Sequence, residues 1–333
     1  MSMETRYLGL ALDHPVVASA SPLSASVDGI CALEDAGASA VVMPSLFEEQ
    51  LRAEQAILER LTESVSEHYA ESLSFFPSIG TYKASSDEYL ETLQAARERT
   101  DIPILASLNG VTPEGWTGHA RELESAGASA IELNVYYLPT DLGETGAEVE
   151  SRYAQVVHAV KSAVSIPVAI KVGPQFSAFG HTAKSLTAAG ADSIVMFNRF
   201  YRPDFDIETL EASRELSLSS AAEIRLGLFW LALLYGNVDA SLAASSGVET
   251  YEQVVKYLLA GADVVMTTSA LLRHGPGHLT GLRDGLADWM ARHGFGAVGE
   301  LRGLMSLDRI ADPAAFERAN YIQLLEEYDT TTA

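Results

Sequence analysis

The feature that most constrains the fold is a four-residue phrase that occurs four times along the chain. Alanine, glycine, alanine and then serine or aspartate stand at 36–39, 126–129, 189–192 and 260–263, starting 90, 63 and 71 residues apart. Each copy follows an amphipathic run and precedes a short apolar run, so we expect the glycine to end a helix in the left-handed conformation and the apolar run to be a buried strand. This spacing, roughly two βα units per interval, predicts an α/β fold of the (β/α)8 or TIM barrel type.

The pattern of apolar runs places the elements of that barrel. We predict an N-terminal hairpin over Thr5–Pro15 that turns at Asp13–Pro15, an acidic helical stretch over Phe47–Tyr69, and a long excursion over Arg199–Gly236 that serves the site. The eight predicted strands are Val16–Ala20, Ala40–Met43, Ile102–Leu108, Ala130–Asn134, Pro167–Val172, Ser193–Phe197, Asp239–Ala244 and Val264–Thr267. Since no linker divides the chain, 1–333 is expected to be one domain, with the hairpin at about 5–15, the barrel at about 16–295 and a tail at about 296–333.

Composition narrows the class of protein. With 333 residues, of which 47% are hydrophobic, the chain can bury a large core, and the net charge of −23 argues against partners such as nucleic acid or anionic membrane. No apolar run reaches the length of about 18 residues that spans a bilayer, and the first residues lack a signal-peptide pattern, so a cytoplasmic protein is expected.

The single cysteine, Cys31, excludes internal disulfides and cysteine-ligated iron–sulfur clusters, and we expect it to be buried in the first helix. No metal site is predicted, because His274 and His278 lack a nearby carboxylate cluster.

Polar residues stand where the predicted strands end, and a closed barrel brings all strand ends to one mouth. Ser107 and Asn109 end strand three, while Ser246–Gly247 and Thr268–Ser269 follow strands seven and eight. Two adjoining loops of small residues let backbone N–H groups approach an anion closely, which predicts a phosphate site; a solvated turn is the alternative for either loop alone.

The ends of strands four to six carry groups suited to a polar ring. An ammonium at the end of an apolar strand is costly without an acceptor, so Lys171 is predicted to lie near an electron-accepting ring, where it would stabilise negative charge on a reduced flavin. The alternative is a lysine that reaches solvent or pairs with a carboxylate. Asn134 and Asn198 suit an amide-rich heterocycle, or each caps a helix. Arg199 and Arg202 could bind a substrate carboxylate or form surface ion pairs.

A series of short motifs links the chain to a known family through its order and spacing. The motifs are Leu8–Leu10, His14–Ala20, Ser78–Gly80, Ser107–Gly110, Glu132–Asn134, Ile170–Pro174, Gly247–Thr250, Thr268–Leu271 and Glu300–Gly303. In this order the chain resembles the FMN-dependent class 1 dihydroorotate dehydrogenases over nearly its whole length. The resemblance implies a homodimer, pyrimidine contacts at Asn134 and Asn198, and FMN as cofactor. The residues that it implies for FMN are Ala18, Ser19, Ser107, Asn109, Lys171, Ser246, Gly247, Thr268 and Ser269.

The chain departs from the family at the residues that handle the substrate. The family follows its strand-four asparagine with Leu-Ser-Cys-Pro-Asn, whose cysteine removes a proton, but Val135–Pro139 reads Val-Tyr-Tyr-Leu-Pro, with Tyr137 at the position of the base. Pro44–Ser45 replaces a lysine–serine pair, and Pro77 stands near another expected asparagine. These departures predict a retained FMN cradle and a largely lost orotate clamp.

A tyrosine beside a flavin favours acid chemistry, because its ordinary pKa lies near 10. We therefore predict a flavin oxidoreductase acting on the CH–CH bond of a small conjugated carbonyl- or pyrimidine-like substrate, with Tyr137 as the first choice of proton donor and Tyr136 as the second. Dihydroorotate stays open as substrate, and both tyrosines could instead be packing residues at the mouth, where Tyr82, Lys83 and Tyr201 could also lie. Two alternatives of other classes are a flavin-binding or non-catalytic subunit that works with a redox partner protein, and a flavin-free phosphate-binding barrel lyase or isomerase.

Overall fold

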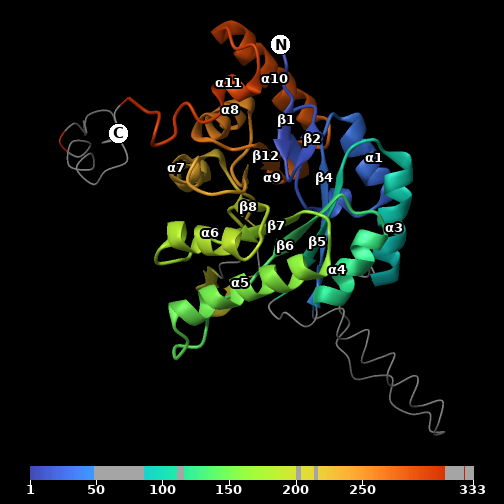
Figure 1. Cartoon of the computed structure of the whole chain (residues 1–333), viewed down its shortest axis with the longest axis vertical. Helices are drawn as coiled ribbons and strands as arrows, with labels where there is room; N and C mark the ends of the chain where they lie inside the picture. Colours follow the sequence, from blue (N-terminus) through green and yellow to red (C-terminus); the bar gives the residue numbers. More distant parts are fainter. Residues whose placement is uncertain (49–85, 111–115, 200–203, 214–216, 312–325, 327–333) are drawn as a thin grey trace, which may run out of the picture.

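Eight parallel strands close into a barrel, which confirms the predicted (β/α)8 fold (Figure 1). The computed structural model describes residues 1–48, 86–110, 116–199, 204–213, 217–311 and 326. Around the barrel the strand order is β11-β12-β3-β4-β5-β6-β7-β8. Their bounds are β3 Val16–Ala18, β4 Val41–Phe47, β5 Ile104–Asn109, β6 Ala130–Asn134, β7 Val168–Val172, β8 Ser193–Met196, β11 Ser241–Ala244 and β12 Val264–Thr267.

Helices surround this barrel on its outer face (Figure 1). The longer helices among the described residues are α1 Val27–Asp35, α3 Ser86–Arg99, α4 Trp116–Ser125, α5 Gly146–Ala163, α6 Phe179–Ala188, α7 Ile224–Leu234, α8 Tyr251–Ala260 and α10 His278–His293. Shorter ones are the 3-10 helices η1 Pro22–Ser24 and η2 Ala221–Glu223 and the α-helices α9 Ser269–His274 and α11 Val298–Leu301. The N-terminus lies beside α11, where Ser2 bridges to Ala297.

The repeated glycines end helices as predicted. Gly37, Gly127, Gly190 and Gly261 have φ angles of 91°, 94°, 108° and 122° and follow α1, α4, α6 and α8. A residue with a Cβ is strained at such angles, so glycine lets the chain leave each helix and enter the next strand at once.

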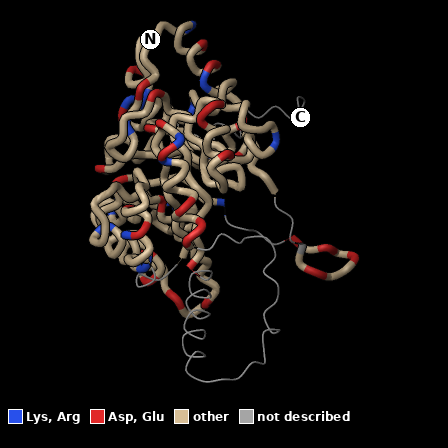
Figure 2. Tube along the Cα trace, turned by 90° about the vertical axis from the view of Figure 1, so that its right-hand side faces the viewer, with Lys and Arg blue, Asp and Glu red and all other residues tan. Residues whose placement is uncertain are grey.

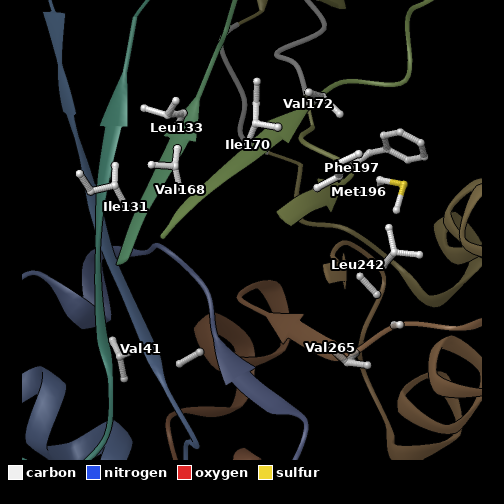
Figure 3. Close-up of a cluster of buried hydrophobic side chains, with 14 of the residues drawn as sticks. Val41, Ile131, Leu133, Val168, Ile170, Val172, Met196, Phe197, Leu242 and Val265 are labelled. Atoms are coloured by element: carbon white, nitrogen blue, oxygen red, sulfur yellow. The ribbon is translucent and has the colours of Figure 1, made fainter. Parts of the chain in front are cut away.

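Strand alternation divides the apolar residues into two cores. Ile131 and Leu133 of β6, with Val168 and Ile170 of β7, belong to the outer core that the strands share with the helices. Figure 3 shows these four side chains on the neighbouring strands. The intervening positions face the barrel interior, which is lined by a second and smaller cluster that includes Val17, Val42, Leu105, Ala130, Ala169, Val195 and Met266. Side-chain direction along each strand therefore decides which residues can reach the mouth.

The N-terminal hairpin closes the barrel bottom. Its strands are β1 Thr5–Tyr7 and β2 Leu10–Leu12, and Tyr7 packs into the interior cluster. The predicted turn at Asp13–Pro15 is wrong: the chain reverses at Leu8 and Gly9, whose φ angles of 54° and 76° suit a two-residue hairpin turn. His14 instead leads into β3, where its Nδ1 accepts a hydrogen bond from the Val16 N–H.

Other predicted boundaries need correction. Phe47 ends β4 instead of starting a helix, and residues 49–85, which hold most of the predicted acidic stretch, Pro77, Tyr82 and Lys83, lie outside the described residues. The excursion over Arg199–Gly236 contains a hairpin of β9 Asp204–Asp206 and β10 Glu211–Ser213, and its second half is the barrel helix α7. Cys31 lies in α1 as predicted, but it is partly exposed instead of buried, because it lies on a side of α1 that the core does not cover.

Acidic residues are scattered over the elements of the described trace and outnumber the basic ones (Figure 2). In the part of the chain that the structure describes, no helix is both long enough and apolar enough to cross a membrane.

Candidate functional site

A cavity of about 350 Å³ opens at the carboxyl ends of the strands. This volume lies within the range of small-ligand and cofactor pockets. Nine of the sequence-predicted site residues line it, namely Ser19, Asn134, Lys171, Asn198, Arg199, Ser246, Gly247, Thr268 and Ser269. Residues from six strands and their following loops thus meet at one mouth.

Five predicted site residues do not line this cavity. The Ala18 side chain packs in the outer core against the helices, away from the cavity. Its backbone N–H donates to the Ala40 carbonyl within the barrel sheet. Ser107 and Asn109 are buried on β5, where the Ser107 hydroxyl lies 2.8 Å from that of Ser45. Tyr136 and Tyr137 follow β6 and are also absent from the cavity wall.

Lys171 is the charged group at the cavity floor. Its side chain is 11% exposed, and its Nζ lies 3.4 Å from Ser19 Oγ and 3.5 Å from Glu132 Oε1. The ammonium is thus anchored from the barrel interior while it lines the cavity. Glu132 was not recognised from the sequence as a site residue; a single charge in an apolar strand, two positions before Asn134, was the available signal.

The loops after β11 and β12 form a close-fitting cradle of small residues. Ser246 and Gly247 have φ angles of 76° and 70°, and a Cβ on Gly247 would lie 2.7 Å from Ile224 Cγ2. The Gly247 N–H donates to Ser219 Oγ, which also lies 2.9 Å from Ser269 Oγ. The Gly247 N–H and the hydroxyls of Ser219 and Ser269 therefore lie together where the phosphate was predicted, and their chemistry suits a phosphate monoester.

Sequence reasoning missed the segment that completes this cradle. Ser217, Leu218 and Ser219 line the cavity from the excursion, and the Ser219 carbonyl accepts a hydrogen bond from Arg273. Their contribution had no sequence signal, because the path of a long excursion is set by contacts with distant loops.

Two polar side chains span the cavity between β6 and β8. The Asn198 amide donates to Asn134 Oδ1 at 2.5 Å, so the pair presents its remaining donors and acceptors as one unit. Arg199 also lines the cavity, but its Nε lies 2.8 Å from Glu223 Oε2 and it donates to the Ser217 carbonyl. A substrate carboxylate would have to share this guanidinium with Glu223. Arg202 and Tyr201 lie outside the described residues.

The loop after β6 directs Tyr137 toward helix α5. The Tyr137 hydroxyl donates to Glu144 Oε2 at 2.5 Å, Arg152 donates to Glu144 Oε1 at 2.6 Å, and the Arg152 guanidinium lies 4.0 Å above the Tyr137 ring. The hydrogen bond to Glu144 raises the pKa of Tyr137 above its ordinary value, with Arg152 acting in the opposite direction. Since a higher pKa makes a phenol a weaker proton donor, this network reduces the acidity of the residue at the position of the family's base.

The histidines singled out in the sequence lie apart from the cavity wall. The rings of His274 and His278 are 4.9 Å apart, and His278 Nε2 lies 2.6 Å from the Glu249 carbonyl. Within the described ranges, no group of three or more His, Cys, Asp or Glu side chains is arranged to hold a metal ion.

A parallel barrel with a cationic floor, an amide pair and a small-residue cradle at its mouth defines a class of cofactor- or phosphate-binding barrel enzymes. Sequence comparison identifies the family within that class. The model of the family described as dihydroorotate dehydrogenase matches residues 65–290. The chain therefore belongs to the dihydroorotate dehydrogenase family, and with it to the oxidoreductases that act on CH–CH groups.

Curated relatives align along most of their length. The chain is 27% identical over 310 residues to a dihydroorotate dehydrogenase B (NAD(+)), catalytic subunit, of Methanothermobacter thermautotrophicus, covering 91% of this chain and 98% of the relative. It is 29% identical over 233 residues to a putative dihydroorotate dehydrogenase A (fumarate) of Aeropyrum pernix, covering 68% and 74%. A second catalytic subunit of type B, from Methanosarcina mazei, is 26% identical over 307 residues, covering 89% and 93%.

Proposed function

We propose that the cavity at the barrel mouth binds FMN and that the protein moves a hydride between this flavin and a small conjugated carbonyl- or pyrimidine-like substrate. Lys171 carries the proposal, because its nearly buried ammonium lines the cavity above Glu132 and can therefore receive an anionic or electron-accepting ligand there. Bound FMN would supply the hydride chemistry at its ring system. Flavin dependence is general in the family, which supports this choice.

The protein groups have separable roles in this proposal. Ser246, Gly247, Thr268 and Ser269 would hold the phosphate through N–H groups and hydroxyls, with Ser219 as an added hydroxyl. Lys171 and Ser19 would hold the electron-accepting end of the ring. Asn134 and Asn198 would orient an amide or carbonyl of the substrate, while Arg199 binds a carboxylate in competition with Glu223.

The proton donor is proposed in the loop after β6. Val135 packs in the outer core and Tyr137 packs against that core. Alternation would therefore direct Tyr136, the residue between them, to the same side as Asn134, next to the cavity that Asn134 lines but outside its wall. We therefore rank Tyr136 before Tyr137, which reverses the order favoured by alignment with the family's base. A phenol donates a proton to the carbon next to the one that receives hydride, so the pair of steps reduces an activated C=C bond.

The polypeptide is proposed to act as one domain. Two of the relatives described above are named as catalytic subunits, which supports a second protein subunit as the electron partner. A small molecule is the alternative. The homodimer implied by the family remains a prediction.

Cofactor binding tests this function directly. Purified protein titrated with FMN should quench flavin fluorescence at one FMN per chain, and Lys171→Met should weaken binding by about tenfold or more, the effect of losing one hydrogen bond to a charged group. Lys161→Met is the matched control, because Lys161 pairs with Asp192 outside the cavity. Failure of the wild-type protein to retain FMN would contradict the proposal and favour a flavin-free barrel.

A further inference from the structure

The barrel interior holds a buried carboxylate that none of the roles above explains. Glu132 lies in the middle of β6, and its side chain is 1% exposed. Neither carboxylate oxygen accepts a hydrogen bond from the described residues. The surrounding interior positions include the apolar residues Ala130, Ala169 and Val195. A carboxylate in such surroundings is costly unless a cation offsets its charge.

The strand register places this carboxylate directly beneath the cavity floor. Glu132 is paired with Ala169 across β6 and β7, and Asn134 is paired with Lys171. Lys171 therefore points into the barrel one pleat nearer the mouth than Glu132 does. Its Nζ lies 3.5 Å from Glu132 Oε1. Lys171 lines the cavity whereas Glu132 does not, so the lysine separates the carboxylate from any ligand.

Two hydroxyls share the barrel interior with this pair. Tyr7 from the hairpin and Ser193 from β8 have buried oxygens without a hydrogen-bond partner among the described residues. Burial and, next, the charge of Glu132 raise the pKa of Tyr7 above the ordinary range. Tyr89 shows the same two influences, and its hydroxyl accepts a hydrogen bond from the Ser107 N–H. Neither phenol supplies positive charge, so the described partner that offsets Glu132 is Lys171.

An ammonium has three N–H donors. One donor of Lys171 Nζ goes to Ser19 Oγ at 3.4 Å and Glu132 lies beneath the ammonium, which leaves a donor for a ligand in the cavity. We propose that Glu132 is a positioning residue that acts through Lys171, holding the ammonium at the cavity floor and partly offsetting its charge toward the ligand. This inference rests on the proposed function, because the ligand it addresses is the electron-accepting ring of FMN. Glu132 thereby lowers the reduction potential that Lys171 alone would give.

The reduction potential of bound FMN tests this role, since it responds to charge and not to fold stability alone. Glu132→Gln keeps the shape and one oxygen of the side chain but removes the negative charge. The reduced flavin should then be favoured about tenfold more than in the wild type, which for a two-electron couple is a rise of about 30 mV. Glu132→Met removes the same charge with a flexible apolar side chain and should give the same rise if Glu132→Gln does not fold.

Two comparisons isolate the action through Lys171. In a Lys171→Met background no ammonium remains through which Glu132 could act, so adding Glu132→Gln should leave the potential unchanged. Asp192→Asn is the matched control, because Asp192 pairs with Lys161 away from the cavity and should not move the potential. An unchanged or lower potential in Glu132→Gln, or the same rise in the Lys171→Met background, would overturn the proposal.

Unfolding of the protein without FMN separates this proposal from the proposed function. Glu132→Gln and Lys171→Met should each lower the urea midpoint, and the double variant should be no less stable than the weaker single variant, because the two charges are removed together. Additive losses would contradict the ion pair. If the pair couples but the wild type binds no FMN, the proposed function fails and the role toward a flavin fails with it. If FMN binds and the potential does not respond, only the role of Glu132 fails.

Discussion

The floor and cradle of the cavity differ from the loop after β6 in how closely they keep the family's pattern. At the floor and cradle, Lys171, Ser246, Gly247 and Thr268 line one cavity as the resemblance implied. In the loop after β6, the family's base position is held by Tyr137, whose hydroxyl is bonded to Glu144 and whose ring lies under Arg152. The floor and the cradle thus carry the residues that the resemblance implied, while the loop after β6 differs from the family's sequence and is held by contacts of its own.

Under the proposed function, the groups that hold the cofactor and the loop that faces the substrate lie in separate parts of the barrel. The cradle depends on small residues and backbone conformation at the ends of β11 and β12, which tolerate few changes. The loop after β6 depends on side chains that can be exchanged without disturbing the strands. We therefore propose that this chain keeps the family's oxidoreductase chemistry and acts on a different substrate.

The largest expected effect is at the cavity floor. Lys171→Met should lower the rate of substrate-dependent flavin turnover by 10²- to 10³-fold, because a preorganised charge beside a developing negative charge contributes about that much. Stopped-flow absorbance with the FMN-loaded protein measures this rate. Turnover within a few-fold of wild type would mean that the floor and cradle do not carry the chemistry.

The next prediction concerns the stability of the folded protein at low pH. Burial, and then the positive charge of Arg283, lowers the pKa of His14 from 6.5 to about 4. The folded state favours the neutral imidazole, so its contribution is fully present above pH 6.5 and is lost as the pH falls from 6.5 to about 4, on the order of 3 kcal/mol in all. Urea unfolding at pH 7 and pH 4.5 should show this loss in the wild type and a smaller one in His14→Asn. The exposed His181→Asn is the control; an equal loss in His14→Asn would contradict this assignment.

The next prediction compares the two tyrosines of the loop after β6, Tyr136 and Tyr137. Tyr136→Phe should lower turnover by about 100-fold if it supplies the proton, since general acid catalysis contributes at least that much. Tyr137→Phe should change turnover less than tenfold, because its hydroxyl is held by Glu144. Steady-state kinetics on both variants measures the difference, and a larger loss in Tyr137→Phe would restore the order that the alignment favoured.

The smallest expected effect is on the loop itself. Arg152→Met removes the Glu144 ion pair and the contact with the Tyr137 ring, and should destabilise the protein by about 1 kcal/mol. Proteolysis within 135–145 should become faster in this variant. Arg121→Met is the control, because Arg121 makes a long 3.4 Å hydrogen bond to the Ala163 carbonyl at an exposed position. Equal proteolysis rates in both variants would mean that the network does not hold the loop.

Local signals sufficed for much of the fold and for part of the site. The four repeated glycines determined where helices end, because a left-handed residue is a local requirement, and the strand ends then placed Lys171 and Ser246–Gly247 at one mouth. The hairpin turn at Leu8 and Gly9 was misplaced because Asp13–Pro15 carries a stronger turn composition than a leucine at positive φ.

The remaining site features depend on contacts between distant residues. The orientation of Tyr137 is decided by Glu144, seven residues further along, and by Arg152 on α5. Ser219 reaches the cradle through the course of the excursion, and its contact with the Gly247 N–H joins two separate loops. Glu132 required the strand register to show that it lies beneath Lys171 and not on the helix side. Composition and spacing do not contain this information.

The most direct measurement of the contrast between the two regions is an anaerobic titration of the FMN-loaded protein with dihydroorotate, followed by dithionite. If the cofactor side is kept and the substrate side is changed, the visible flavin bands should persist with dihydroorotate and disappear with dithionite. Rapid and complete bleaching by dihydroorotate would contradict that contrast, because the altered loop after β6 would then still support the family's own reaction.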